Sequence, residues 1–210
     1  GLTFEFPRTK HPGHLKEKGY NGIDLTNALN CWVRDVRIIN ADSGIFIHRG
    51  KHITVTDVVL SGRRMHHPLC SCWGADCLFT RFRIEAPHIH GTTISWSTHG
   101  TVFSNGWGRN LAMDAHRACS FQNLHSNIVI AAGGKLQSPF RSGGSRPRGP
   151  HTARSNVYWN IRIEFDTDKG SARVSGHDEW PLGVFAFWRS NRTLSFKPTP
   201  GLMQRVIGLG

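Results

Sequence analysis

A short apolar strand, a polar corner and a second strand recur along this chain at intervals of about 20 residues. The longer strands begin at Cys31 (CWVRDVRI), Ile53 (ITVTDVVL), Cys77 (CLFTRFRI), Thr101 (TVFSNGWG) and Cys119 (CSFQNLHS). The shorter strands that precede them are GIDL from Gly22, GIFI from Gly44, TTIS from Thr92 and LAMD from Leu111. Because so short a unit cannot bury its own apolar face, the repeat predicts copies stacked into a solenoid.

The repeated segments have the composition and the alternation of strands. They are rich in Val, Ile, Phe and Thr, and no segment places apolar residues at helical spacing over three turns. In CWVRDVRI, Val33 and Val36 can both face inward only if the strand bends near Asp35. The same bend sends Arg34 and Arg37 to solvent.

The opening residues of the repeated strands are small or apolar. We therefore predict that they point into the coil interior and stack at the parallel-strand spacing of about 4.8 Å. The residues are Cys31, Ile53, Cys77 and Cys119.

Asn and Gly corners separate three short strands in GYNGIDLTNALNCWVRDVRIINADSGIFI, from Gly19 to Ile47. This arrangement resembles the right-handed parallel β-helices of the pectin-lyase-like superfamily. A narrower resemblance, to uncharacterised secreted β-helix proteins, lies around VFSNGWGRNLAMDAHR and SGGSRPRGPHTARSNVYWNIR. The resemblance implies a secreted or cell-surface protein that is either a carbohydrate-active enzyme or a non-catalytic surface protein.

The likeness covers residues 1–164, and the chain divides there. Residues 1–164 are predicted to form the β-helix coils, with a long basic loop at about 135–154, and residues 165–210 a C-terminal capping segment. The chain begins with Gly1 and has no signal peptide, so we expect a fragment that lacks earlier N-terminal coils.

The net charge of the chain indicates which class of partner it binds. Twenty-six Lys and Arg residues against 14 Asp and Glu give a formal net charge of +12. A field of this sign attracts polyanions, and a β-helix offers an acidic polysaccharide a long straight surface. Nucleic acid is less favoured because no recognised nucleic-acid-binding motif is present. No apolar run is long enough to cross a bilayer. The sequence does not predict an oligomeric state.

The basic loop is rich in Gly, Pro and Ser, and long solenoid loops usually fall on the binding face. Its arginines are suited to bind carboxylates or sulfates through two parallel hydrogen bonds. The predicted substrate-binding residues are His88, His90, Trp107, Lys135, Arg141, Arg148, His151 and Arg154. A solvated loop without a role is the alternative.

The sharpest chemical cluster is Asp114-Ala115-His116-Arg117. In an extended segment Asp114 and His116 project to one face, and His88 and His90 do likewise. Asp114, His116 and Arg117 are the predicted catalytic residues, because an acid, an imidazole and a guanidinium supply what a polysaccharide lyase needs. A purely structural role at a corner is the alternative.

No metal ligand is predicted. His66 and His67 would alternate faces in an extended segment and are predicted to form a loop. Cys70, Cys72 and Cys77 are interpreted as core residues before a disulfide or a soft metal site. The scattered Asp24, Asp35, Asp42 and Asp57 give calcium only weak support, so no cofactor is predicted. The sequence also lacks the close carboxylate pair of an inverting glycoside hydrolase.

Two functions follow. The first is a polysaccharide-lyase-like protein acting on an acidic polysaccharide; the second is a non-catalytic glycan-binding or structural wall or surface protein.

Overall fold

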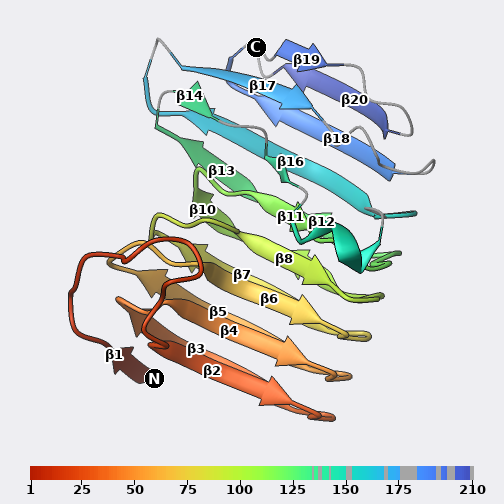
Figure 1. The fold of residues 1–210 in the computed structure, drawn as a ribbon. Helices are drawn as coiled ribbons and strands as arrows, with labels where there is room; N and C mark the ends of the chain where they lie inside the picture. The colour runs from red at the N-terminus through yellow and green to blue at the C-terminus, as the bar shows by residue number, and fades with distance from the viewer. Residues whose placement is uncertain are drawn as a thin grey trace.

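The structure is a computed structural model of residues 1–210 (Figure 1). It describes residues 1–133, 135–136, 139–141, 143–149, 153–167, 170–175, 184–192, 195–197 and 202–208. These residues form a right-handed parallel β-helix of about six turns, which confirms the predicted fold.

One side of the coil is a six-stranded parallel sheet in the order β15-β11-β8-β6-β4-β2. Its strands are β2 (Asn21–Thr26), β4 (Ser43–His48), β6 (His67–Cys72), β8 (Thr92–Ser95), β11 (Met113–Ala115) and β15 (Phe140–Arg141). We call it the short-strand sheet.

The opposite side is an 11-stranded parallel sheet, which we call the long-strand sheet. Its strands are β1 (Leu2–Glu5), β3 (Trp32–Ile39), β5 (Thr54–Ser61), β7 (Leu78–Ile84), β9 (Val102–Ser104), β10 (Trp107–Arg109), β12 (Leu124–Ser126), β13 (Val129–Ala132), β16 (Val157–Phe165), β18 (Val184–Ser190) and β20 (Leu202–Gly208). β9 and β10 both pair with β7, and β12 and β13 both pair with β16. Each of these pairs is therefore one long strand divided by a bend.

The bends recur at equivalent positions of the long strands. The residues there adopt a left-handed backbone with φ between 48° and 55°. They are Asp35, Asp57, Arg81, Asn105, Asn127 and Asn160. Asn and Asp tolerate this conformation better than most residues, so the sequence favours a bend at these places. The expected bend at Asp35 is confirmed.

The bend exposes Arg34 and Arg37 and leaves Val33 and Val36 buried, as predicted. Parallel pairing places Val33 beside Val55 and Val55 beside Phe79, steps of 22 and 24 residues. The repeat is thus slightly longer than the sequence predicts.

Aromatic rings fill the later part of this inward column. Phe79 stacks on Phe103 with ring centroids 4.6 Å apart, and His125 stacks on both Phe103 and Tyr158 at 4.9 Å. All four side chains are buried. Continuous ring stacking supports the register through the middle of the molecule.

The prediction that the opening residues of the strands point into the coil is confirmed for Ile53 and Cys77, which are buried. It is partly confirmed for Cys31, which is half-buried. It is wrong for Cys119, which is exposed. The register pairs Leu78 with Val102 and Val102 with Leu124, so the position before each strand holds Cys77, Thr101 and Asn123. Cys119 lies earlier, at a corner with φ of 62°.

The C-terminal strands continue the stack. β18 and β20 add in parallel to β16, and a three-stranded sheet forms from β14 (Lys135–Leu136), β17 (Ser171–Ser175) and β19 (Ser195–Lys197). The division of the chain at residue 164 and the role of residues 165–210 as a cap stay predictions. The one helix in the described part of the chain is η1 (Arg146–Arg148), and no described helix is long and apolar enough to cross a membrane.

His125 should make stability depend on pH. Burial lowers its pKa to about 3, so the folded protein keeps this ring neutral while the unfolded chain protonates near pH 6.5. Its contribution to the free energy of unfolding is therefore complete above pH 6.5. As the pH falls toward 3 it is lost, at up to about 1.4 kcal/mol per pH unit.

We expect His125→Phe to lose less stability than the wild type between pH 6.5 and pH 4, measured by urea unfolding. Phe suits the aromatic column, although the bond between His125 Nε2 and Thr92 Oγ1 (3.2 Å) is lost. An identical loss in both proteins would contradict a neutral buried His125.

Candidate functional site

The outward face of the short-strand sheet carries chemistry-bearing side chains in columns. Pairing aligns Asp24, Phe46, Cys70, Thr93 and Asp114 in one column. A second column contains Thr26, His48, Cys72 and Ser95. The alternate residues of these strands, such as Ile45, Leu69 and Ile94, are buried in the coil. The period-two alternation therefore separates the core from a potential binding face.

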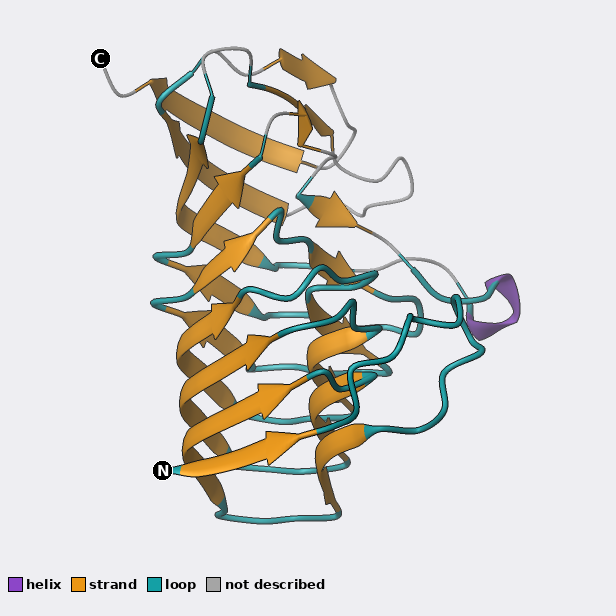
Figure 2. Ribbon diagram, turned by 90° about the vertical axis from the view of Figure 1, so that its left-hand side faces the viewer, coloured by secondary structure: helices purple, strands orange, loops and turns teal. Residues whose placement is uncertain are grey.

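A groove of about 600 Å³ lies over this face, and we call it the histidine groove. One side is formed by His14 and Leu15 of the loop between β1 and β2, residues 6–20, and the other by the Gly143–Arg148 segment. Figure 2 shows η1 standing out beside the stacked coils on the side to which the loop from β1 also turns. The groove is lined by His14, Leu15, Phe46, His48, His66, His67, Cys70, Cys72, His90, Ser95, Trp96, His116, Gly143, Gly144, Ser145 and Arg148.

Asp114 lies beneath this groove in β11 and is 1% exposed. Its Oδ2 is hydrogen-bonded to His90 Nδ1 and lies 3.4 Å from His116 Nε2, and its Oδ1 accepts a bond from the Gly143 amide at 3.1 Å. Burial alone would raise the pKa of Asp114, but the bonds to His116 and His90 hold it well below its ordinary value. Asp114 is thus a buried carboxylate kept ionised by two imidazoles.

Four imidazole rings pack against each other around Asp114. His67 stacks on His66 and on His90, with centroids 4.4 Å apart in each case, and His90 meets His116 edge-on at 4.7 Å. Burial lowers the pKa of His67 to about 2 and that of His66 to about 4; Glu17 opposes the shift of His66, and the neighbouring imidazoles add to both shifts. These two rings are therefore neutral at physiological pH.

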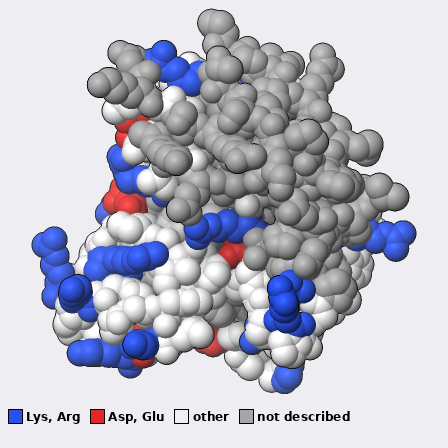
Figure 3. Space-filling model, turned by 45° about the horizontal axis from the view of Figure 1, so that its top comes forward, with Lys and Arg blue, Asp and Glu red and all other residues white. Residues whose placement is uncertain are grey.

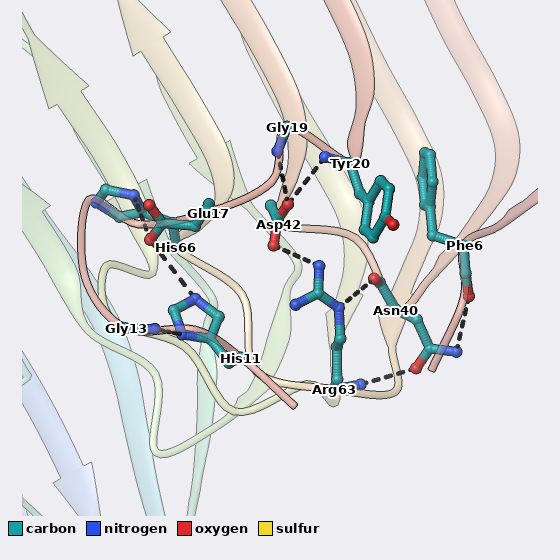
Figure 4. Close-up of polar contacts among 10 residues, drawn as sticks. All are labelled: Phe6, His11, Gly13, Glu17, Gly19, Tyr20, Asn40, Asp42, Arg63 and His66. Carbon is teal, nitrogen blue, oxygen red and sulfur yellow. Dashed lines mark hydrogen bonds and ion pairs between the residues drawn. The ribbon is translucent and has the colours of Figure 1, made fainter. Parts of the chain in front are cut away.

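The loop between β1 and β2 is anchored at its C-terminal end by a buried ion pair, and Asn40 Nδ2 donates to the Phe6 carbonyl at its start (3.2 Å, Figure 4). Asp42 accepts hydrogen bonds from the amides of Gly19 (3.0 Å) and Tyr20 (2.8 Å) and pairs with the Arg63 guanidinium. Arg63 Nε also donates to the Asn40 carbonyl at 2.6 Å. Both side chains of the pair are almost fully buried, so this contact fixes where the loop re-enters the coil.

Glu17 joins this loop to the histidines. Its Oε1 lies 3.1 Å from His66 Nδ1 and 3.5 Å from His11 Nε2 (Figure 4). His14, on the same loop, meets the His66 ring edge-on at 4.7 Å and lies 5.7 Å from the His90 ring. The loop thus adds an imidazole and a carboxylate to the groove.

Two arginines and two tryptophans form a stack at the corner beside the groove. Trp73 and Trp96 stack at 4.6 Å, with the Arg49 guanidinium 5.0 Å from the first ring and that of Arg148 4.9 Å from the second. The indole faces are therefore covered by each other and by guanidinium groups. Such cation–π contacts stabilise the rim and place the Arg148 charge at the groove.

Of the predicted catalytic residues, the structure brings Asp114 and His116 together on one face, as predicted. Arg117 is placed differently. It is buried, its Nη1 donates to the Gly149 carbonyl at 2.8 Å and its amide donates to the Gly143 carbonyl at 3.2 Å. It therefore holds the Gly143–Gly149 segment in place and is not among the residues that line the groove.

His88 and His90 do not share a face, because the segment before β8 is not an extended strand. His90 lines the groove, whereas His88 lines a separate 270 Å³ pocket with Arg64 and Arg109. Burial lowers the pKa of His88 to about 4. Arg141 donates to the Ile89 carbonyl between the two histidines.

The other predicted binding residues lie apart from the groove or are not described. Arg148 lines it, but Arg154 lines a different pocket with Cys119 and Phe121. Trp107 lies in β10 of the long-strand sheet, under the Arg83 guanidinium at 3.8 Å. The Lys135 backbone lies in β14, its side chain is not described, and His151 lies outside the described residues.

The interpretation of His66 and His67 was wrong, whereas that of Cys70 and Cys72 is confirmed in their burial but not in their place. His66 and His67 lie on the same side, because the chain bends before β6 begins at His67. Cys70 and Cys72 are buried and free, but they lie under the groove rather than in the coil interior. Burial raises the pKa of the Cys72 thiol to about 12 and also raises that of Cys70, which keeps both protonated.

His14 and Glu17 were missed entirely. Both lie in an irregular loop whose path is set by the Asp42–Arg63 pair, not by any local pattern. The density of histidines in the sequence, 13 in 210 residues, was the one available signal. Two sets in the described part of the chain each bring three imidazoles close enough for a metal ion: His14, His66 and His90, and His67, His90 and His116.

Comparisons with known proteins identify the architecture. No family model and no curated protein matches the chain. Two solved structures of a DFA-IIIase mutant from Arthrobacter chlorophenolicus A6 are similar, one with a TM-score of 0.58 at 14% identity and one, in complex with DFA-III, with 0.57 at 12%. Each match covers 84% of this chain and 42% of the other, so the chain spans less than half the length of those proteins.

Gly143 should be intolerant of any side chain. A Cβ there would lie 2.2 Å from His116 Nε2, well inside van der Waals contact. We expect Gly143→Ala to displace the His116 ring and to destabilise the fold by about 1–3 kcal/mol, as overpacking does. Urea unfolding and the NMR signals of the histidine rings measure the two effects.

The matched control is Gly133→Ala, whose Cβ would meet only the Arg109 guanidinium, at 3.4 Å, and the Asp166 carboxylate, at 4.0 Å. It should change stability by less than about 0.5 kcal/mol. Unshifted His116 signals in Gly143→Ala would show that the groove is looser than the described contacts.

Proposed function

We propose that this protein is a carbohydrate-active β-helix protein of polysaccharide-lyase type that acts on an acidic polysaccharide in the histidine groove. One observation carries the proposal: the buried Asp114 carboxylate orients His90 and His116 at the base of an open groove that has Arg148 at its rim. A secreted or cell-surface location belongs to the same proposal.

The groove offers the groups that β-elimination requires. The His116 imidazole, as general base, removes the proton from the carbon next to the uronate carboxylate. The electron pair then forms a carbon–carbon double bond, the adjacent bond to the glycosidic oxygen breaks, and that oxygen takes up a proton from the groove or from water. Asp114 offsets the charge of the imidazolium that forms, which favours the proton transfer.

The carboxylate of the substrate needs a cation, and Arg148 is better placed than Arg117. Arg148 lines the groove and is exposed, whereas Arg117 is buried under the Gly143–Gly149 segment. A guanidinium can bind a uronate carboxylate with two parallel hydrogen bonds. In the proposed mechanism, Arg148 therefore takes the role that the sequence suggested for Arg117.

The protein's charge and its fold relatives support a polysaccharide partner. The net charge is +12, and Figure 3 shows Lys and Arg in several separate groups on the face that it views, with fewer Asp and Glu beside them. The similar solved structures are of a carbohydrate-active enzyme. The fold alone does not fix the sugar.

A non-catalytic glycan-binding or structural wall or surface protein is the second candidate. The observation that favours it is the covered state of Trp73 and Trp96, whose faces pack on each other and on arginines as in a structural spine. Binding and turnover are therefore tested separately.

Binding should be electrostatic. We expect polygalacturonate to bind at low salt and to be released as salt rises, since the screening length falls to about 8 Å at physiological ionic strength. Arg148→Ala should weaken binding about tenfold or more, the loss expected for a charged hydrogen-bonded contact. Arg154→Ala, in a separate pocket, is the control for general charge and should have a smaller effect. Equal retention on neutral and anionic glycan columns would contradict the proposal.

Turnover should depend on His116. We expect His116→Ala to lower the rate of unsaturated uronate formation, followed by ultraviolet absorbance, by about 10²- to 10⁴-fold, the usual loss for a general base. Glycan affinity should change little, whereas the urea midpoint should fall, because the buried Asp114 loses one of its two imidazole partners. His99→Ala, a half-buried histidine outside the groove lining, is the control. If the wild type forms no unsaturated product from any acidic glycan, the binding protein becomes the better description.

A further inference from the structure

Three histidines from separate segments converge where the loop between β1 and β2 crosses the coil. His14 comes from that loop, His66 precedes β6 and His90 precedes β8. Each offers one ring nitrogen, and these nitrogens lie within 4.8 Å of one another. Imidazole is the usual nitrogen ligand of zinc and of neighbouring transition metals.

The orientation of two of these rings suits metal binding. His66 Nδ1 lies 3.1 Å from Glu17 Oε1, and His90 Nδ1 is hydrogen-bonded to Asp114 Oδ2. In each ring the carboxylate contacts Nδ1, which leaves Nε2 as the nitrogen for an ion. Metal-binding histidines characteristically have such a carboxylate behind them, because it fixes the tautomer and makes the free nitrogen more basic.

Charge around the three rings also favours a cation. Although the chain is strongly basic, the groups directly behind His66 and His90 are two carboxylates, Glu17 and Asp114. Both are largely buried, with side-chain exposures of 13% and 1%. Glu17 Oε1 lies between His66 Nδ1 (3.1 Å) and His11 Nε2 (3.5 Å), so its negative charge faces imidazoles and no Lys or Arg is paired with it among the described residues.

We propose that His14, His66 and His90 bind a zinc-class divalent ion, with Glu17 and Asp114 as the carboxylates that orient His66 and His90. Three protein ligands leave a fourth position for water or for a ligand oxygen, as in catalytic rather than structural zinc sites. Zinc–nitrogen distances of about 2.0–2.1 Å require the rings to approach more closely than they now do. The His14 loop can supply this movement, since its buried anchor is at its end, at Gly19 and Tyr20.

The second set, His67, His90 and His116, is a poorer site. His116 Nε2 and His90 Nδ1 both face Asp114 Oδ2, and His67 Nδ1 lies 3.0 Å from Thr93 Oγ1. These nitrogens already serve the network around Asp114. An ion bound by His14, His66 and His90 instead leaves His116 available to accept a proton. A role for the ion beside a bound uronate rests on the proposed function. Binding of the ion does not depend on that function.

Zinc binding by the full chain, stripped with EDTA, tests the site without any glycan. Calorimetry should give one Zn²⁺ per chain, and Co²⁺ should give the visible absorption of a four-coordinate site. His14→Asn should abolish this binding, and the variant should fold because His14 is exposed. Glu17→Gln should weaken affinity by about 10- to 100-fold, the usual cost of removing the group behind a ligand.

His67→Asn and His99→Asn are the matched controls, since neither residue belongs to the proposed set. Retained affinity in both, with loss in His14→Asn, supports the site. The proposal is overturned if the wild type does not bind zinc, if His67→Asn loses binding while His14→Asn keeps it, or if His99→Asn is as damaging as His14→Asn. Lyase activity is measured separately, so its absence would leave this result intact.

Discussion

Every coil of this protein must follow the same backbone path as the coil below it, because the parallel strands are hydrogen-bonded only to their neighbours in the stack. The left-handed residues that recur from Asp35 to Asn160 make this possible by bending each long strand at the same point. Once the path repeats, side chains at equivalent positions are forced into columns. The aromatic core column and the outward column that contains Asp114 are two results of one constraint.

The histidine cluster of the groove does not follow this regular column pattern. Columns of like residues would place small polar or apolar groups along the whole face, as Cys70 and Thr93 do. The imidazoles instead gather at the ends of the strands: His66 and His90 precede β6 and β8, His67 begins β6, and His116 follows β11. Irregular corners and a crossing loop therefore build the cluster, and the regular sheet supports it from below with the buried Asp114.

Much of the fold could be predicted from the sequence, because the strand repeat, the bend at Asp35 and the shared face of Asp114 and His116 are all local patterns. Cys119 was misplaced because a small apolar residue near the expected position was taken for the start of a strand, whereas the register assigns that position to Asn123. His14 and Glu17 could not be found. Their place depends on the Asp42–Arg63 pair, which anchors the loop through Gly19 and Tyr20 and leaves no pattern in the sequence around His14.

The loop between β1 and β2 also limits how many coils can lie between β2 and β6. It leaves the coil at β1, is anchored beside Asp42, and reaches the level of His66 and His90. Each added or deleted coil between β2 and β6 would change that rise by about 4.8 Å. Duplications that add coils should therefore be tolerated beyond β16 but not between β2 and β6, where the number of repeats is set by a loop that lies outside the repeat.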